Sequence, residues 1–246
     1  MIKILHYCWF GGSPLPSQAI KYMDSWKKFC PEFKIKRWDE TNFDIESVRF
    51  VAQAYKEKKW AFVSDYVRTY ALFHEGGLYV DTDVEFIRSI DDLTFTSFMG
   101  FETCQYVNPG LVLYAANPYL NIYSKILERY EKTEFNSDLL THITSPVIYT
   151  EVLQEMGLKL NNTLQRIDNI TVYPTEFFQP LGSVFGGKDN FTNNTRTIHH
   201  YDASWFSAAD KQYFELRKKY GKVRGRLIFI ISHPKMALKK LLDKIK

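Results

Sequence analysis

Two carboxylates at the end of a short apolar segment are the first candidates for chemistry. Asp81 and Asp83 flank Thr82 and directly follow the apolar residues 78–80. Side chains at positions i and i+2 of an extended segment point to the same side, so both carboxylates can face one bound ion. Mg²⁺ and Mn²⁺ take oxygen ligands of this kind and keep positions for phosphate oxygens. The pair therefore indicates a cation that holds a diphosphate, although an Asp-x-Asp spacing alone also occurs in ordinary solvated turns.

A segment with helical spacing precedes the acidic pair and carries three more polar candidates. Asp65 lies three residues and Ser64 four residues before Arg68, so all three can share one edge of a helix. An ordinary surface ion pair is the alternative interpretation. It is weakened because the polar groups are surrounded by apolar and aromatic residues, namely Trp60, Phe62, Val63, Tyr66, Val67, Tyr70 and Leu72. Gly76 and Gly77 follow, and glycine commonly ends a helix.

A second group of candidates lies far downstream, where His199 and His200 are followed by Ser204 and Trp205. Neutral histidine binds Mn²⁺ as well as zinc, and an indole N–H can donate to a phosphate oxygen. Successive residues of a strand face opposite sides, so we expect at most one of the two histidines to reach a metal. A purely structural role for these histidines is the competing interpretation.

The elements that must position these residues follow from the pattern of apolar residues. We expect strands at residues 2–8, 33–38, 78–80, 97–101, 111–115, 171–173 and 197–201, and helices at residues 18–29, 47–58, 61–73, 119–130 and 147–156. Alternation of this kind predicts an α/β sheet with helices on both faces. Ligands of such sheets collect at the carboxyl ends of strands, where the acidic pair and the glycine-containing loop 9–14 both fall.

The C-terminal part differs from the rest in charge. Residues 217–246 contain eleven Lys or Arg and one acid, whereas residues 1–216 contain twenty-one basic and twenty-seven acidic residues. We therefore predict a catalytic domain at 1–216 and a basic tail at 217–246. Near its end, Leu238, Leu241, Leu242 and Ile245 form an apolar stripe among lysines, which is typical of a helix in the surface of an anionic membrane. A basic helix packed on the domain is the alternative.

Other sequence features bear on the compartment. Three cysteines without CxxC spacing fit a reducing compartment. We find neither a secretory signal nor an apolar run long enough to span a membrane, and expect a cytoplasmic protein, peripheral on the inner face of the cell membrane. The acidic body and the lack of a recognised motif argue against nucleic acid as a partner.

The segment from Trp60 to Asp83 resembles the signature of glycosyltransferase family 32, the DXD-containing sugar transferases. This family includes fungal mannosyltransferases and bacterial capsular polysaccharide transferases, and its core is similar to that of glucosylating bacterial toxins. Residues 6–11 resemble its opening motif, and the His-His…Ser-Trp element resembles its closing motif. The resemblance implies a GT-A fold, with a Rossmann-like mixed sheet flanked by helices, a metal-bound nucleoside-diphosphate sugar and transfer with retention of configuration.

Carried over position by position, the resemblance gives each candidate a role. Trp9 and Tyr79 would lie beside the nucleobase, Ser64 and Asp65 would contact the donor, and Arg68 would contact its sugar or phosphates. Asp81 would serve ribose and metal, Asp83 the metal, and His200 with Ser204 and Trp205 would close the site over the diphosphate. His200 is preferred to His199 as the third metal ligand because a tyrosine follows it. The family pattern is only partly recognisable at residues 108–110 and 144–146, which normally shape the acceptor side.

These observations predict a retaining hexosyltransferase with Asp83, Arg68 and Asp81 as catalytic residues and Mn²⁺ or Mg²⁺ as its cofactor. The expected donor is a nucleoside-diphosphate sugar, most simply a UDP-sugar. The expected acceptor is a lipid-linked glycan in the synthesis of a capsular or other surface polysaccharide. Two alternatives stay open, a non-catalytic nucleotide-sugar-binding protein and a metal-dependent nucleotidyltransferase.

Overall fold

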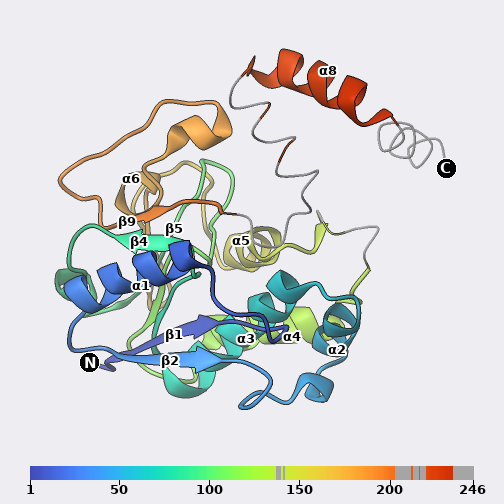
Figure 1. Ribbon diagram of the computed structural model, residues 1–246. Coiled ribbons are helices and arrows are strands. Elements are labelled where there is room, and N and C mark those ends of the chain that lie inside the picture. Colours follow the sequence, from blue (N-terminus) through green and yellow to red (C-terminus); the bar gives the residue numbers. More distant parts are fainter. Residues whose placement is uncertain (137–139, 141, 203–211, 213–215, 217–219, 235–246) are drawn as a thin grey trace. The chain divides into compact units, whose positions relative to one another are not determined.

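The computed structural model divides the 246-residue chain into two compact units, residues 1–201 and 202–246 (Figure 1). The structure describes residues 1–136, 140, 142–202, 212, 216 and 220–234. Ser204, Trp205 and the apolar stripe at 238–245 lie outside the described residues. In the second unit, the described helix is α8 (Lys222–Ser232). None of the described helices is both long and apolar enough to cross a membrane.

A seven-stranded mixed sheet forms the centre of the first unit. Its strand order is β2-β1-β3-β6-β5-β8-β7. The strands are β1 (Ile4–Cys8), β2 (Lys34–Trp38), β3 (Gly77–Tyr79), β5 (Ser97–Gly100), β6 (Leu113–Ala115), β7 (Gln165–Ile167) and β8 (Ile170–Tyr173). The pairings make β1, β2, β3, β5 and β8 run in one direction, with β6 and β7 opposed to them. The carboxyl ends of five strands therefore meet at one edge.

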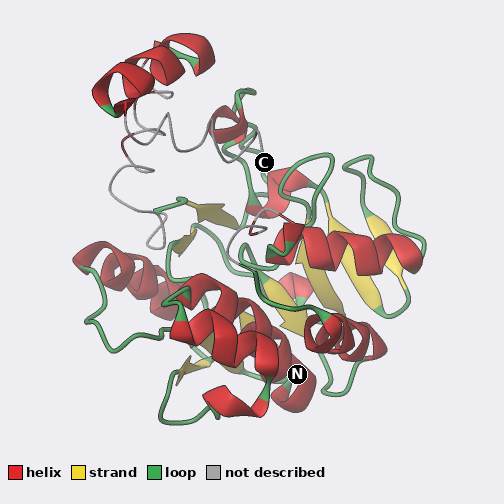
Figure 2. Ribbon diagram, turned by 90° about the vertical axis from the view of Figure 1, so that its right-hand side faces the viewer, coloured by secondary structure: helices red, strands yellow, loops and turns green. Residues whose placement is uncertain are grey.

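Helices cover both faces of this sheet because successive strand residues alternate between two apolar cores (Figure 2). Tyr79 and Leu113 join the core made with α2 (Arg49–Lys56), α3 (Trp60–Glu75), α4 (Asn121–Lys132) and α5 (Ser145–Glu155). Their neighbours Leu78 and Tyr114 join the core made with α1 (Ser17–Phe29) and α6 (Thr175–Phe178). The prediction of a mixed α/β sheet flanked by helices is confirmed.

Several element boundaries differ from the prediction by a few residues, and two of these differences have a clear backbone cause. The helix expected from residue 119 begins at Asn121, because Tyr119 has a φ of 60°, outside the right-handed helical region. The strand expected over 197–201 ends at His199, and Tyr201 has a φ of 53°. A positive φ is uncommon for residues other than glycine, so the chain turns sharply at both tyrosines.

A separate two-stranded antiparallel ribbon joins the acidic segment to the downstream histidines. It pairs β4 (Val84–Phe86), which was not predicted, with β9 (Thr197–His199). Val84 lies opposite His199, and the backbone N–H of His200 donates to the carbonyl of Asp83 at 3.0 Å. The ribbon thus places the ends of two segments more than a hundred residues apart next to each other.

Candidate active site

The candidate residues gather at the edge of the sheet where the parallel strands end. Trp9 follows β1, Asp81 comes two residues after β3, and Glu102 comes two residues after β5. Asn108 and Gly110 precede β6, which runs in the opposite direction, so they lie at the same edge. This is the position at which open α/β sheets bind their ligands.

Arg68 stands between two carboxylates in the half of the site built from α3 and β3. Its Nη2 atom lies 3.0 Å from Oδ1 of Asp65 and 3.0 Å from Oδ1 of Asp81. The hydroxyl of Ser145 donates to Asp65 at 2.8 Å, and the hydroxyl of Tyr79 donates to Asp81 at 2.8 Å. The side chain of Arg68 is 4% exposed and that of Asp65 is 9% exposed. We call this group, Asp65, Arg68, Tyr79, Asp81 and Ser145, the buried ion cluster.

The charges of the buried ion cluster support one another. Burial raises the pKa of Asp65 to about 6, while Arg68 and the Ser145 hydroxyl act against that rise. Burial alone would lower the pKa of Arg68, but the carboxylates of Asp81 and Asp65 hold it well above its ordinary value. Burial also raises the pKa of Asp81, and the nearby carboxylate of Asp83 contributes to the rise. A cation beside Asp81 and Asp83 would relieve their mutual repulsion.

Asp81, Asp83 and His199 form the other half of the site. Each offers one ligand atom, and these atoms lie within 4.8 Å of one another; no other group of this kind occurs in the part of the chain that the structure describes. A ring nitrogen of His199, Nε2, lies 3.0 Å from Oδ1 of Asp83. The other, Nδ1, is buried and has no hydrogen-bond partner among the described residues. We call these three residues the cation group.

The donor atoms of the cation group fit a divalent transition metal. Carboxylate oxygens suit Mg²⁺ and Mn²⁺, and an imidazole nitrogen adds preference for a transition metal over Mg²⁺. Burial alone would lower the pKa of His199, but Asp83 raises it, and the imidazole must be neutral to ligate. A metal would then compete with a proton for this ring.

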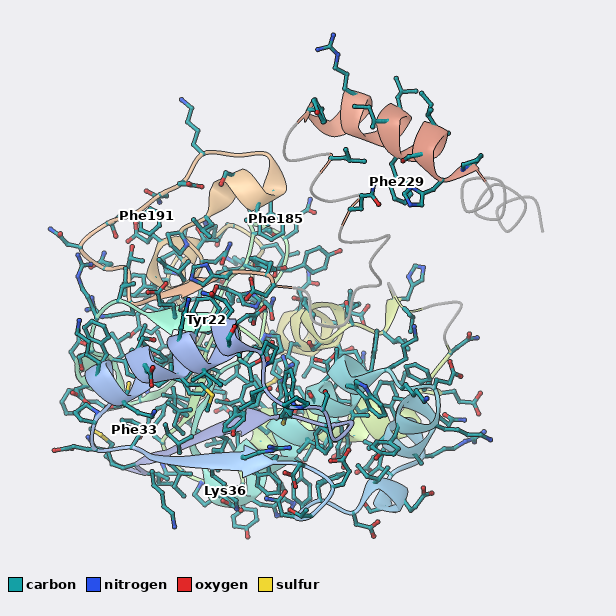
Figure 3. All side chains as sticks on the ribbon, viewed as in Figure 1. Tyr22, Phe33, Lys36, Phe185, Phe191 and Phe229 are labelled. Atoms are coloured by element: carbon teal, nitrogen blue, oxygen red, sulfur yellow. The ribbon has the colours of Figure 1, made fainter. Side chains whose placement is uncertain are left out.

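The structure gives His199 and His200 different partners. His199 belongs to the cation group, whereas Nε2 of His200 lies 2.8 Å from Oε2 of Glu85. The His200 ring stacks on Tyr22 of α1 with ring centroids 4.4 Å apart; Figure 3 labels Tyr22. The expectation that only one histidine reaches the acidic pair agrees with this arrangement, but the geometry favours His199 over the predicted His200.

Three predicted donor contacts have other partners in this structure. The hydroxyl of Ser64 donates to the carbonyl of Trp60 in its own helix at 3.0 Å. The indole N–H of Trp9 donates to the carbonyl of Ser13 at 2.6 Å, and the ring is partly buried. Tyr79 is 1% exposed, so its ring supports Asp81 and Arg68 from beneath, with Cζ of Arg68 5.0 Å from the ring centroid. This burial leaves no surface of Tyr79 to lie beside a nucleobase.

Sequence reasoning missed a network on the far side of Asp81. The carbonyl of Gly110 accepts from the N–H of Asp81 at 3.1 Å, and Oδ1 of Asn108 accepts from the N–H of Gly110 at 2.7 Å. A β-carbon at position 110 would collide with Oδ2 of Asp81, so any larger residue there would displace that carboxylate. Asn108 in turn contacts Glu102. An acid directly after the apolar run 97–101 was the available signal for this network.

Comparisons with known proteins agree with this geometry. Residues 16–99, which include Asp81 and Asp83, match the family model described as glycosyltransferase sugar-binding region containing DXD motif. A stretch of 145 residues is 26% identical to Toxin Afp18 of Yersinia ruckeri serotype O1, and covers 55% of this chain. It spans only 7% of the length of that toxin.

Two solved structures align with parts of this chain. The PaToxG glycosyltransferase gives a TM-score of 0.50 at 18% identity, over 62% of this chain and 68% of that one. A glycosyltransferase involved in the glycosylation of the major capsid of PBCV-1 gives a TM-score of 0.44 at 11% identity, over 85% of this chain and 98% of that one. The family match supports a glycosyltransferase enzyme, and the likeness to PaToxG is consistent with a GT-A-like fold. Membership of family 32 in particular stays a prediction.

Proposed function

We propose that this chain is a metal-dependent glycosyltransferase that moves a hexose from a nucleoside-diphosphate sugar to a glycan acceptor. The observation that carries the proposal is the cation group at the carboxyl end of β3, inside a region that matches DXD glycosyltransferases. The two carboxylates and one imidazole leave room in the coordination sphere of Mn²⁺ for phosphate oxygens. From the resemblance to family 32, we further propose that the nucleotide is UDP and that transfer proceeds with retention of configuration.

The proposed chemistry assigns distinct tasks to the residues around the cation group. A bound Mn²⁺ or Mg²⁺ would neutralise the negative charge that develops on the leaving diphosphate. Arg68 and Tyr79 hold the Asp81 carboxylate in place before any ligand arrives, through contacts of 3.0 and 2.8 Å. Such preorganisation is a major source of transition-state stabilisation. Because Arg68 is 3% exposed, we assign it to positioning and to the local positive field rather than to direct contact with the sugar.

The proposed transfer needs no side chain as general base. The acceptor hydroxyl oxygen bonds to the anomeric carbon on the face from which the nucleoside diphosphate departs, and the leaving phosphate oxygen takes the hydroxyl proton. Configuration at the anomeric carbon is then retained. Ser64, Asp65 and Trp9 as donor contacts, and Ser204 and Trp205 as a cover over the diphosphate, remain part of this proposal.

A donor panel tests the proposal and its two rivals together. The protein is incubated with Mn²⁺ and each of several UDP- and GDP-sugars, and separately with a nucleoside triphosphate and a sugar phosphate, and free nucleoside diphosphate and pyrophosphate are measured. We expect slow release of nucleoside diphosphate from one donor, which EDTA abolishes and Mn²⁺ restores. Binding without release would indicate a non-catalytic nucleotide-sugar-binding protein. Formation of pyrophosphate from a nucleoside triphosphate would indicate a nucleotidyltransferase.

We further propose that the C-terminal segment holds the enzyme at an anionic membrane surface, near a lipid-linked precursor of a surface polysaccharide. Within α8, basic residues such as Arg224 precede an apolar run in which Leu227 is 54% exposed and Ile231 is 78% exposed. Apolar burial and attraction to anionic lipid both favour surface binding by such a segment.

Liposome co-sedimentation tests this attachment. We expect the full chain to sediment with vesicles that contain anionic lipid and to remain in solution with neutral ones. Deletion of residues 224–246, or the double variant Leu227→Glu and Ile231→Glu, should release it while donor hydrolysis continues. Unchanged sedimentation of the deletion variant would contradict the proposal.

A further inference from the structure

Glu102 is a carboxylate at the active edge to which the proposed chemistry gives no task. It comes two residues after β5, and its backbone N–H donates to the carbonyl of Tyr106 at 2.8 Å in the turn that ends at Val107. It is only half-buried, and it does not belong to the cation group. A partly desolvated carboxylate needs hydrogen-bond donors to offset its lost hydration, so its surroundings are informative.

Two donors fix one oxygen of this carboxylate. Oε1 of Glu102 accepts from Nδ2 of Asn108 at 2.5 Å and from the hydroxyl of Tyr201 at 2.9 Å. Asn108 is 7% exposed, so its amide is a rigid support. Oε2 has no hydrogen-bond partner among the residues described. A structural link between Asn108 and Tyr201 needs only the oxygen that both already share, and the second oxygen therefore stays available to a ligand.

The same contacts tie Glu102 to the cation group from two sides. Through Asn108 it connects to Gly110, whose carbonyl accepts from the N–H of Asp81. Through Tyr201 it connects to His199, because the two rings lie 4.0 Å apart between centroids. The charge of Glu102 is also close enough to contribute to the raised pKa of His199, after the lowering effect of burial and the larger effects of Asp83 and Asp81. Glu102 is therefore linked to His199 through Tyr201, and to Asp81 through Asn108 and Gly110, at the same edge of the sheet.

The surface beside Glu102 has the character of a site for a sugar ring. Tyr106 is 39% exposed and belongs to the same turn as Glu102. Phe185, labelled in Figure 3, is 49% exposed and contacts the Tyr201 ring edge-on at 5.5 Å. Apolar surface with a few placed polar groups is typical of small-molecule sites. Hydroxyl groups are the donors that such a carboxylate accepts, with stronger hydrogen bonds than a neutral acceptor makes.

We propose that Glu102 is a specificity-determining residue that accepts a hydrogen bond from a hydroxyl group of the sugar being transferred. This inference rests on the proposed function and deepens it. It assigns recognition of the donor sugar to Glu102, which belongs to the hydrogen-bond network of Asn108, Gly110 and Asp81. If the hydroxyl group belongs to the transferred sugar, Glu102 affects binding of the sugar conjugate and not of the nucleoside diphosphate alone.

The test compares binding of the nucleoside diphosphate with binding of its sugar conjugate. Calorimetry in Mn²⁺ is performed on the full chain, on Glu102→Gln and on Glu176→Gln. Glu176 is a matched control because it also accepts from an asparagine amide, Nδ2 of Asn194 at 2.8 Å, and is not part of the site.

We expect Glu102→Gln to bind Mn²⁺ and the nucleoside diphosphate within about twofold of wild type. Its affinity for the sugar conjugate, and kcat/KM for donor hydrolysis, should fall roughly tenfold to a hundredfold. Glu176→Gln should change neither.

Donors that lack one hydroxyl group sharpen the test. With the deoxy donor that lacks the hydroxyl held by Glu102, wild type and Glu102→Gln should bind equally, as a double-mutant cycle requires for a direct contact. If Glu102→Gln does not fold, Glu102→Asp keeps the charge while withdrawing the oxygen, and should show the same sugar-specific loss.

Two results would overturn the inference: an unchanged ratio of conjugate to diphosphate affinity, whether or not both affinities fall, or an equal loss with every deoxy donor. Absence of any nucleotide-sugar binding by wild type would instead refute the proposed function itself.

Discussion

The buried ion cluster and the cation group meet at Asp81 but differ in how well their polar atoms are satisfied. Around Arg68, each charged or hydroxyl group has a partner within the protein, at distances from 2.8 to 3.0 Å. In the cation group, Asp81 and Asp83 repel each other and Nδ1 of His199 has no partner among the described residues. The polar groups of the buried ion cluster are therefore already paired within the protein. The cation group still has atoms that can bind a ligand.

The largest expected effect is a loss of activity when the cation group is changed. Asp83→Ala should reduce donor hydrolysis by about 10³-fold or more, because a cation worth several kcal/mol to the leaving group loses a ligand. Its thermal stability without metal should be nearly unchanged, since the repulsion with Asp81 disappears as well. Asp24→Ala, which removes an exposed acid paired with Lys27 on α1, is the control and should keep full activity. Metal-dependent turnover by Asp83→Ala would show that the cation group is misassigned.

The second effect falls on stability. Arg68→Ala should lower the free energy of unfolding by about 3–5 kcal/mol, because Asp65 would be left as a buried, uncompensated charge near the partly exposed Asp81. Arg129→Ala, which breaks ion pairs with Glu151 and Glu155 at the surface, should cost about 1 kcal/mol or less. Urea unfolding without metal measures both. Equal losses in the two variants would remove the distinction between a buried support and ordinary surface pairing.

The sequence allowed one part of the site to be predicted and not the other. The residues of the α3–β3 segment were identified because helix, glycine stop and strand are local patterns, and Asp65, Arg68 and Asp81 lie within seventeen residues. His199 was not chosen because its place depends on the pairing of β4 with β9, a contact across 116 residues that no local pattern encodes. Glu102 was not chosen although its contact with Asn108 spans only six residues, because its link to Tyr201 spans 99 residues and its place beside Asp81 depends on the fold. The positive φ of Tyr119 and Tyr201 has no residue-type signal either.

A third effect is a dependence of the folding stability on pH, which arises at His6. His6 of β1 is fully buried, and burial lowers its pKa to about 4. Its Nε2–H donates to the carbonyl of Gly76 at 2.9 Å, and its Nδ1 accepts from the indole N–H of Trp38 at 3.0 Å, so the folded ring is neutral. The unfolded chain takes up a proton below about pH 6.5. His6 therefore stabilises the fold above that pH, and this contribution is lost as the pH falls toward 4.

The difference between wild type and a variant isolates this contribution, because the raised pKa of Asp65 acts in the opposite direction over the same pH range. The stability advantage of wild type over His6→Gln should shrink by about 3 kcal/mol between pH 7 and pH 4. Denaturant unfolding at several pH values measures it. The exposed His74 provides the control, and His74→Gln should show no such trend. A constant difference between wild type and His6→Gln would contradict a neutral, buried His6.

The smallest effect concerns one hydroxyl group. Tyr79→Phe should cost about 1–2 kcal/mol of stability, since it removes a hydrogen bond to the charged Asp81. Tyr123→Phe is a matched control, because its buried hydroxyl has no partner among the residues that the structure describes, and its loss should be neutral or stabilising. Thermal denaturation distinguishes the two. Identical behaviour of both variants would mean that the Tyr79 hydroxyl does not hold Asp81.

The β4–β9 ribbon has a consequence for how the protein is made. Because Asp83 and His199 are 116 residues apart, a nascent chain cannot assemble the cation group until nearly the whole first unit has been synthesised and folded. Partly folded or truncated chains would compete poorly for the metal and the donor. Under the proposed function, a bound cation and nucleotide would in turn favour the complete fold by mass action. Binding of the donor would then depend on the integrity of the entire first unit and not of the segment around Asp81 alone.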